Sequence, residues 1–586
     1  MKKYSIFSLL LCVGAISSCD DFFQPETDDA LSGDKYMSSI TEMATGYLGI
    51  LTKMQAIGDK EIYLTDTRGD MLEPTEQSIA PLIALYNYDN DLSDNEYADP
   101  AGYYDVVIAC NDYLYKMEHF RANYPEVVNE QTNYFRGLYA SAIRVKAWAY
   151  MTLAEIYGQA LWFDDPIHSF KDVNDASVFT PMKTGALVQK CIKMLQTEVT
   201  IDTLTISPKE TFSWISWIDP SNVNNISNSD YRYWDMTTPS YEPLMARLQI
   251  WNAACLEGAG NKAEAQLAYQ EVANQLLPYL QSYWAQFTHY WKRCPTTPGH
   301  LSSFWNYSTP YQEEVVGAII YDYTKNQTNQ ILYHFSNEYP NKYLLRPNVA
   351  ALDRYKDKEY NPCLGEGDKR MGLTAKEVYG QWCISKYRPN ANVRANAYQD
   401  DVHIYTFRCS ELFLWLAEAL NHLGRYEAVN RIINSGFSSA DYDMLLALQN
   451  DDKEGYTEAQ YHEFAGFNTY WAVPTATDKY GTYTGFRKCL DNLETVDVWN
   501  TEGHTDEEAQ LHNDQILARE WTLEFPAEGK SYPNLVRMAE RYNDAAMVSD
   551  YVTVKYGERA PEIAAKIAAV NSISGLPGYY VPWKLK

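Results

Sequence analysis

Residues 408–421 read RCSELFLWLAEALN and predict an α-helix with one apolar face. The residues that define this face recur at spacings of three and four: Leu412, Leu416, Ala419 and Leu423. Gly424 follows as the expected end of the helix, because glycine readily adopts the left-handed conformation that terminates helices.

The same spacing predicts a second long helix in the N-terminal third. Its face is formed by Leu138, Ala142, Val145, Ala149, Thr152 and Ile156, and Gly158 is its expected end. Two glycine turns are also alike: Gly260-Asn261-Lys262 leads to Ala265, and Gly424-Arg425-Tyr426 leads to Val429. Such turns are typical of tetratricopeptide repeats, so the sequence predicts a mostly α-helical fold with degenerate, widely separated helix pairs.

Between the helices, three segments have the composition of long irregular loops: 200–243, 281–312 and 464–486. Strand signals are sparse. Val315 to Tyr323 and Ile331 to Phe335 are the best candidates, and they predict a minor β-hairpin on the helical body.

The N-terminal segment has the pattern of a bacterial lipoprotein leader. Two lysines precede an apolar run at residues 6–16, which suits a secretory signal and is too short to span a bilayer. Small residues then precede Cys19, whose thiol can carry a lipid. We expect a signal peptide at 1–18 and a lipidated acidic tether at 19–35; the alternative is an ordinary secretory leader with an incidental cysteine.

The chain carries 49 basic and 77 acidic residues, a net charge of −28. This sign disfavours nucleic acid and anionic membrane surfaces as partners, because phosphate binding needs clustered lysine and arginine. No stretch after residue 18 is apolar for long enough to predict a transmembrane helix, so membrane attachment would depend on the lipid.

Eight cysteines would remain after the leader and Cys19: Cys110, Cys191, Cys255, Cys294, Cys363, Cys383, Cys409 and Cys489. None of them are close in sequence, which argues against a zinc site or a redox motif. Disulfides and scattered buried thiols are both compatible with this count.

Five segments carry a family resemblance. In the N-terminal third they are Leu64-Thr65-Asp66-Thr67-Arg68-Gly69-Asp70, Tyr104 to Asp112, and Arg144-Val145-Lys146-Ala147-Trp148-Ala149-Tyr150 continuing to Tyr157-Gly158. In the C-terminal half they are Arg408 to Asn421 and Ile516 to Arg537. On these motifs and their order, the chain resembles the SusD/RagB family, surface lipoproteins that work with TonB-dependent transporters. Two positions depart from the family pattern: Arg519-Glu520 reverses the usual Glu-Arg order, and Lys530 stands where arginine is common.

The resemblance implies a single SusD-like domain at 36–586, with an N-terminal part to about residue 240 and a C-terminal RagB/SusD part from about 241. It implies a non-catalytic protein, without a cofactor, that is held in the outer membrane at the cell surface. Such a protein binds an oligomeric nutrient and passes it to a SusC-like TonB-dependent transporter.

The charged residues of the C-terminal motifs have a structural interpretation of their own. Arg408 with Glu411, and Arg519 with Glu524 and Arg537, are spaced to tie neighbouring helices by charge-assisted hydrogen bonds.

No catalytic template is complete in this sequence. His462-Glu463 lacks the second histidine of a zincin helix, Gly529-Lys530-Ser531 lacks the earlier glycine of a P-loop, and Asp89 to Asp94 lacks the turn glycine of a calcium loop. Glycoside hydrolysis needs only two carboxylates, so a surface hydrolase stays open as an alternative.

Aromatic residues are abundant, with 49 tyrosines and 15 tryptophans, and their excess predicts exposed rings that recognise a ligand. Two loop groups carry them: Trp214, Trp217, Tyr231, Tyr233 and Trp234, and Trp284, Tyr290, Trp291, Trp305 and Tyr307. The family's site is built from N-terminal and central loops, so the resemblance favours Arg68, Asp70 and the second group as ligand-binding residues. The alternative is that these rings cover the helical core. We expect an oligosaccharide ligand, with a peptide as the alternative.

Overall fold

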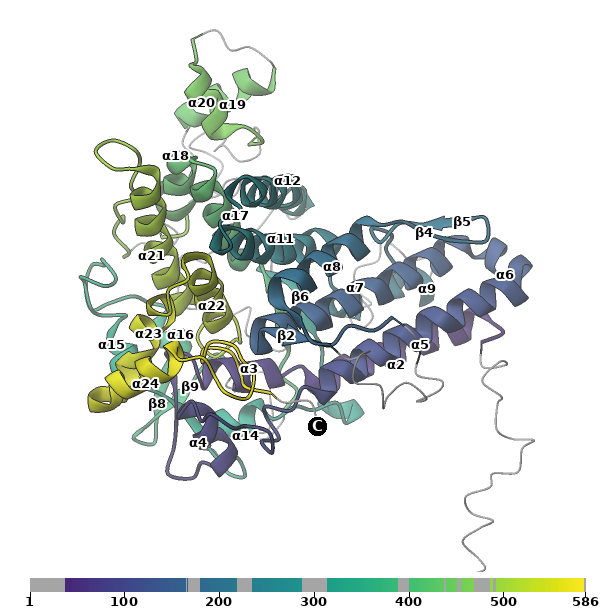
Figure 1. Cartoon of the computed structure of the whole chain (residues 1–586), viewed down its shortest axis with the longest axis horizontal. Coiled ribbons are helices and arrows are strands. Elements are labelled where there is room, and N and C mark those ends of the chain that lie inside the picture. Colours follow the sequence, from purple (N-terminus) through teal and green to yellow (C-terminus); the bar gives the residue numbers. More distant parts are fainter. Residues whose placement is uncertain are drawn as a thin grey trace, which may run out of the picture.

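The computed structural model describes residues 37–164, 166, 180–218, 234–286, 314–387, 400–436, 439–450, 455–467, 485–487 and 492–583. The expected leader, Cys19 and the whole tether lie outside these residues. The described chain is mostly helical, with five two-stranded sheets, as the sequence predicts. Figure 1 shows an elongated lobe of long helices beside a second helical lobe, from whose top α19 and α20 project.

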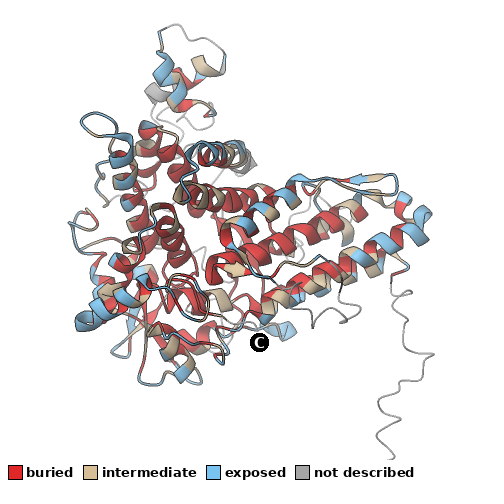
Figure 2. Cartoon of the chain, viewed as in Figure 1, coloured by how far each residue is buried: buried red, intermediate tan, exposed pale blue. Residues whose placement is uncertain are grey.

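Helix α7 (Thr132–Tyr157) is the centre of the elongated lobe and is buried along most of its length (Figure 2). Its many alanines let neighbouring helices approach closely. The other helices of this lobe are α2 (Ile40–Ile57), α5 (Ala101–Asn123), α6 (Pro125–Glu130) and α8 (Thr184–Gln196). Gly158 ends α7 in the left-handed conformation (φ 69°), which confirms the predicted end.

The second lobe contains the predicted helix pairs. Its pairs are α11 (Tyr241–Gly258) with α12 (Lys262–Gln286), and α17 (Cys409–His422) with α18 (Tyr426–Asn430). Gly260 and Gly424 have φ of 82° and 71° in the two turns, and Ala265 and Val429 are buried. The predicted helix–turn–helix junctions are therefore confirmed. Helix α12 extends further into segment 281–312 than its loop-like composition predicts.

Further helices and turns complete the described chain. They are α3 (Lys60–Asp66), α4 (Ala80–Tyr86), α9 (Trp214–Ile218), α15 (Val349–Asp353), α16 (Met371–Thr374), α19 (Ser439–Gln449), α20 (Glu458–Phe464), α21 (Asp506–Glu524), α22 (Ser531–Tyr542), α23 (Ala546–Val552) and α24 (Ala560–Ala568), with η3 (Tyr323–Lys325), η4 (Arg431–Ser435) and η5 (Thr553–Arg559).

One of the two predicted strands is confirmed, and the other is wrong. β6 (Val315–Ile319) pairs with β10 (Ile404–Arg408), whereas Ile331–Phe335 forms helix α14. Periodicity cannot distinguish helix from strand in so short an apolar run, and the partner of β6 comes from elsewhere in the chain. The remaining pairs are β1 (Leu72–Pro74) with β7 (Leu345–Pro347), β2 (Gln159–Ala160) with β3 (Met182–Lys183), β4 (Val199–Ile201) with β5 (Leu204–Ile206), and β8 (Ala375–Val378) with β9 (Gln381–Ile384). The minor hairpins are thus β4–β5 and β8–β9, and β4–β5 lies partly in the segment expected to be a loop.

Buried ion pairs join the helices as expected, but with different partners. Arg408 pairs with Glu528 at 2.8 Å and with Glu524 at 2.6 Å, while Glu411 pairs with Lys530 at 2.8 Å. The prediction of an Arg408–Glu411 pair is therefore wrong, because the Arg408 side chain turns toward the end of α21. Likewise, Arg537 pairs with Glu418, and Arg519 lies over the ring of Tyr360 at 5.6 Å.

Six of the eight cysteines are described, and these six are not disulfide-bonded: Cys110, Cys191, Cys255, Cys363, Cys383 and Cys409. Cys294 and Cys489 lie outside the described residues. Among the described helices, none is both long and apolar enough to cross a membrane.

Candidate binding groove

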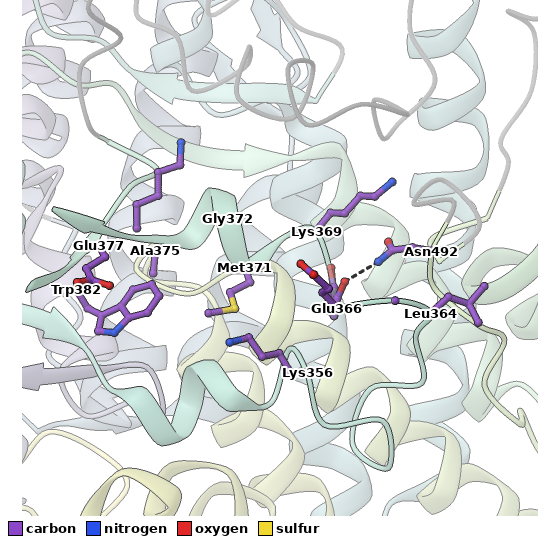
Figure 3. Close-up of a pocket in the computed structure, with 14 residues that line it drawn as sticks. Lys356, Leu364, Glu366, Lys369, Met371, Gly372, Ala375, Glu377, Trp382 and Asn492 are labelled. Atoms are coloured by element: carbon purple, nitrogen blue, oxygen red, sulfur yellow. Dashed lines mark hydrogen bonds between the residues drawn. The ribbon is translucent and has the colours of Figure 1, made fainter. Parts of the chain in front are cut away.

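A groove of about 840 Å³ lies between the loop that follows α15, the hairpin β8–β9 and Asn492. Its volume is in the range of small-molecule binding sites. The lining residues are Lys356, Leu364, Gly365, Glu366, Gly367, Asp368, Lys369, Met371, Gly372, Ala375, Lys376, Glu377, Trp382 and Asn492. Figure 3 shows Met371 in the middle, Trp382 and Glu377 at one end, and Leu364, Glu366 and Asn492 at the other.

The hairpin β8–β9 positions the aromatic end of the groove. Glu377 and Trp382 are directly paired across the two strands, so their side chains share one face. The Tyr343 hydroxyl donates a hydrogen bond to the Trp382 carbonyl, and the Trp382 ring packs partly against the main core. These contacts hold the ring at the groove while leaving part of it accessible.

A buried ionic network lies beneath the loop of the groove. Asp368 pairs with Arg370 at 2.7 Å, and Arg370 Nη1 donates to Glu520 of α21 at 3.0 Å. Burial alone would raise the pKa of Glu520, but the charges of Arg370 and Arg487 outweigh it and lower the pKa below its ordinary value. Ion pairs between buried side chains therefore hold the groove loop against α21.

Asn492 closes the other end of the groove. Its Nδ2 donates to the Gly367 carbonyl at 2.6 Å, and its own carbonyl accepts from the Leu364 amide at 2.7 Å. Its Oδ1 is buried and has no hydrogen-bond partner within the described part of the chain.

The lining combines one aromatic ring, one thioether, side chains of both charges and an amide. This chemistry suits non-covalent recognition of a ligand that has both apolar faces and polar edges. The fourteen lining residues include no serine, cysteine or histidine, so they form no Ser–His or Cys–His pair, and their acidic members are Glu366, Asp368 and Glu377. Over the described ranges, no cluster of side chains has the arrangement of a metal site.

No family model matches the sequence, and no curated protein matches it. Solved structures are similar along almost the whole chain. A SusD homolog from Bacteroides thetaiotaomicron VPI-5482 has a TM-score of 0.54 at 11% identity, covering 96% of this chain and 94% of its own. The chain has the SusD fold.

Two further solved structures are similar to this chain in fold. A SusD superfamily protein from Bacteroides vulgatus ATCC 8482 has a TM-score of 0.53 at 14% identity and covers 93% of this chain and 96% of its own. A proposed sugar binding protein from the same strain has a TM-score of 0.51 at 12% identity and covers 86% and 87%. These likenesses confirm the fold that the sequence resemblance implies.

Within the SusD fold of this chain, Arg68 and Asp70 are buried and far from solvent, each about 1% exposed. Arg68 donates to the carbonyls of Gly578 and Tyr580, and Asp70 pairs with Arg354 at 3.0 Å. The acid-Arg-Gly-Asp turn therefore joins the N-terminal part to segments much later in the chain. Burial gives both side chains a structural role here and does not support direct ligand contact.

The predicted aromatic groups have different positions. Trp214 is buried, and Trp217 and Trp234 pack partly against the core, as the core-covering alternative predicts. Tyr231 and Tyr233 lie outside the described residues. Of the second group, Trp284 has its backbone in α12, while its side chain and Tyr290, Trp291, Trp305 and Tyr307 lie outside the described residues. Their role in binding stays a prediction.

Sequence reasoning missed the groove and Trp382. The missed signal is the two-residue turn Tyr379-Gly380, because a glycine turn between two short segments is typical of a β-hairpin. Trp382 is the one tryptophan between residues 375 and 387, so a search for clustered tryptophans passes over it.

Proposed function

We propose that this chain is a SusD-type capture protein that binds an oligosaccharide without cleaving it and delivers it to a SusC-like TonB-dependent transporter. The groove around Trp382 carries the proposal, because an accessible ring beside amide, lysine and glutamate side chains matches the apolar face and hydroxyl edge of a sugar. The SusD fold and the family motifs support the same role.

The lipoprotein pattern at Cys19 supports a location at the cell surface. Under this proposal, the lipid on Cys19 holds the protein in the outer membrane, and the acidic segment 19–35 is its tether. A Cys19→Ser variant is expected to lose incorporation of labelled palmitate. Unchanged labelling of this variant would contradict a lipid at Cys19.

A binding screen tests the capture function. The chain from Asp20 onward is incubated with arrayed glycans and a peptide pool, and bound polysaccharide is sized before and after. We expect binding to one glycan class with no change in its length. Shortened chains would show a hydrolase instead.

A matched pair of variants assigns the binding to the groove. Trp382→Ala is expected to weaken glycan binding by about tenfold or more, because it removes the stacking surface. Trp162→Ala is the control, because Trp162 stacks on Tyr150 of α7 in the other lobe. Equal affinities of both variants and the wild type would remove the groove from the proposal.

A peptide ligand is the second candidate. The observation that favours it is the presence of both lysine and glutamate side chains along one groove, since these can pair with the charges of a peptide. Binding to the peptide pool alone would select this candidate.

The transporter is tested separately. Gentle extraction of the tagged, lipidated protein is expected to co-purify a large TonB-dependent transporter, and its absence would contradict the delivery step.

A further inference from the structure

The two most exposed large apolar side chains of the described residues lie on neighbouring loops. Tyr339 is 93% exposed and Tyr379 is 85% exposed. Single exposed apolar residues are common on protein surfaces, but two highly exposed tyrosine rings on adjacent loops need a physical explanation.

The two loops are held together by direct hydrogen bonds. Asn337 Nδ2 donates to the Val378 carbonyl at 2.7 Å and to Gln381 Oε1 at 3.1 Å, which ties the loop of Tyr339 to both strands of the hairpin. Tyr343 packs with Val378 and Cys383 in a small buried cluster beneath the tip. The two exposed rings therefore belong to one fixed unit of structure.

The backbone at the hairpin tip is unfavourable for tyrosine. Tyr379 and Gly380 have φ of 51° and 77°, as in the two-residue turn that normally takes Asn-Gly. A tyrosine in this left-handed conformation is strained, and its exposed ring gains little from burial in return. Strain retained at an exposed aromatic residue points to a function for the ring.

The tip continues directly from the groove. The strand pair Glu377–Trp382 lines the groove, and Tyr379 lies at the turn just beyond the next pair, Val378–Gln381. We infer that Tyr339 and Tyr379 extend the groove as stacking platforms for further sugar units of an oligosaccharide whose first units lie over Trp382. This inference rests on the proposed function, and it makes the preferred ligand an extended chain rather than a mono- or disaccharide.

Calorimetric titration with oligosaccharide ladders tests the inference. The probes are malto-, cello- and xylo-oligosaccharides and partially digested pectin, each from disaccharide to octasaccharide, with the chain from Asp20 onward. Wild-type affinity is expected to rise with chain length. The double variant Tyr339→Ala/Tyr379→Asn is expected to lose about tenfold or more in affinity for the long members and to bind the shortest bound member as the wild type does.

Controls separate a binding role from a structural one. Asn fits the left-handed turn, so the Tyr379→Asn variant is expected to melt at the same temperature as the wild type or higher. Leu267→Ala removes another exposed apolar side chain, on α12 and 72% exposed, and is expected to leave affinity unchanged.

Each result has a distinct meaning. Wild-type affinity of the double variant for long chains overturns the inference and leaves the proposed function intact. Unchanged glycan affinity with lost co-purification of the transporter would make the tip a protein-docking surface and also overturn it. If the wild type binds none of the ladders or arrayed glycans, the proposed function and this inference fail together.

Discussion

His334 is a buried base that the fold keeps neutral. Its ring stacks on Tyr63 with centroids 4.1 Å apart, Nε2 accepts from the Tyr97 hydroxyl at 2.8 Å, and Nδ1 donates to the Gln330 carbonyl at 2.7 Å. Burial lowers the pKa of His334 from 6.5 to about 4.

This shift predicts acid sensitivity at the residue scale. As the pH falls below 6.5, the unfolded chain takes up a proton at this histidine before the folded chain does, so stability is full above 6.5 and declines toward pH 4. The contribution of His334 to this decline is about 3 kcal/mol. Urea unfolding across this range is expected to show a smaller decline for His334→Gln than for the wild type. Parallel pH profiles for the two proteins would contradict the assignment.

Strain at Tyr379 predicts a stability gain at the same scale. Tyr379→Asn is expected to raise the free energy of unfolding by about 1 kcal/mol, because asparagine tolerates the left-handed turn. Tyr379→Phe keeps the strain and serves as the control with unchanged stability. A loss of stability in the asparagine variant would show that the ring contributes packing that its exposure does not reveal.

At the scale of elements, α17, α21 and α22 are joined through buried charges. Glu418 of α17 accepts from Arg537 Nε at 3.0 Å and also pairs with Arg541, and both arginines belong to α22. Asp514 of α21 pairs with Arg541 and with His422, so the three helices share one network.

Removing one charged residue of this network should therefore lower the free energy of unfolding. Glu418→Ala leaves the buried Arg537 guanidinium without its carboxylate and removes one of the carboxylates that pair with Arg541, so it is expected to lower the free energy of unfolding by about 3–5 kcal/mol. Glu562→Ala breaks the exposed pairs of α24 with Arg559 and Lys566 and should leave stability unchanged in urea titrations. Similar losses in both variants would argue against the special role of burial.

Local patterns were enough to predict several elements. The apolar spacing and terminal glycines of α7 and α17 specify helices and their ends within the residues themselves, so these predictions succeeded. Ile331–Phe335 failed because five residues are too few for a period to show. The ion-pair partners of Arg408 also failed, because they come from the end of α21 and from Glu314, which no local spacing relates to α17.

The groove could not be predicted from local patterns either. Its wall joins the 356–382 segment to Asn492, and only the tertiary structure brings them together. Arg68 and Asp70 illustrate the converse, because the resemblance identifies their motif, and only the tertiary structure shows their contacts with Tyr580 and Arg354.

At the scale of the whole molecule, the main hydrophobic cluster includes residues from Met37 to Val581 and extends through both helical lobes. A shared core predicts that the two lobes unfold together. Far-ultraviolet circular dichroism and tryptophan fluorescence are expected to report one coincident transition in urea. Two separated transitions would show that the lobes are independent in stability.

The bond from Arg68 to the Gly578 carbonyl spans 510 residues of sequence, and Tyr580 sits against Gly158 at the end of α7. The early helices therefore cannot complete their packing until a segment made much later has arrived. During synthesis, the apolar faces of these early helices stay incompletely packed and exposed to proteases and chaperones. A chain truncated before this segment therefore lacks the contact, and its early helices cannot complete their packing. Only a chain that includes the segment can bury these apolar faces and avoid degradation.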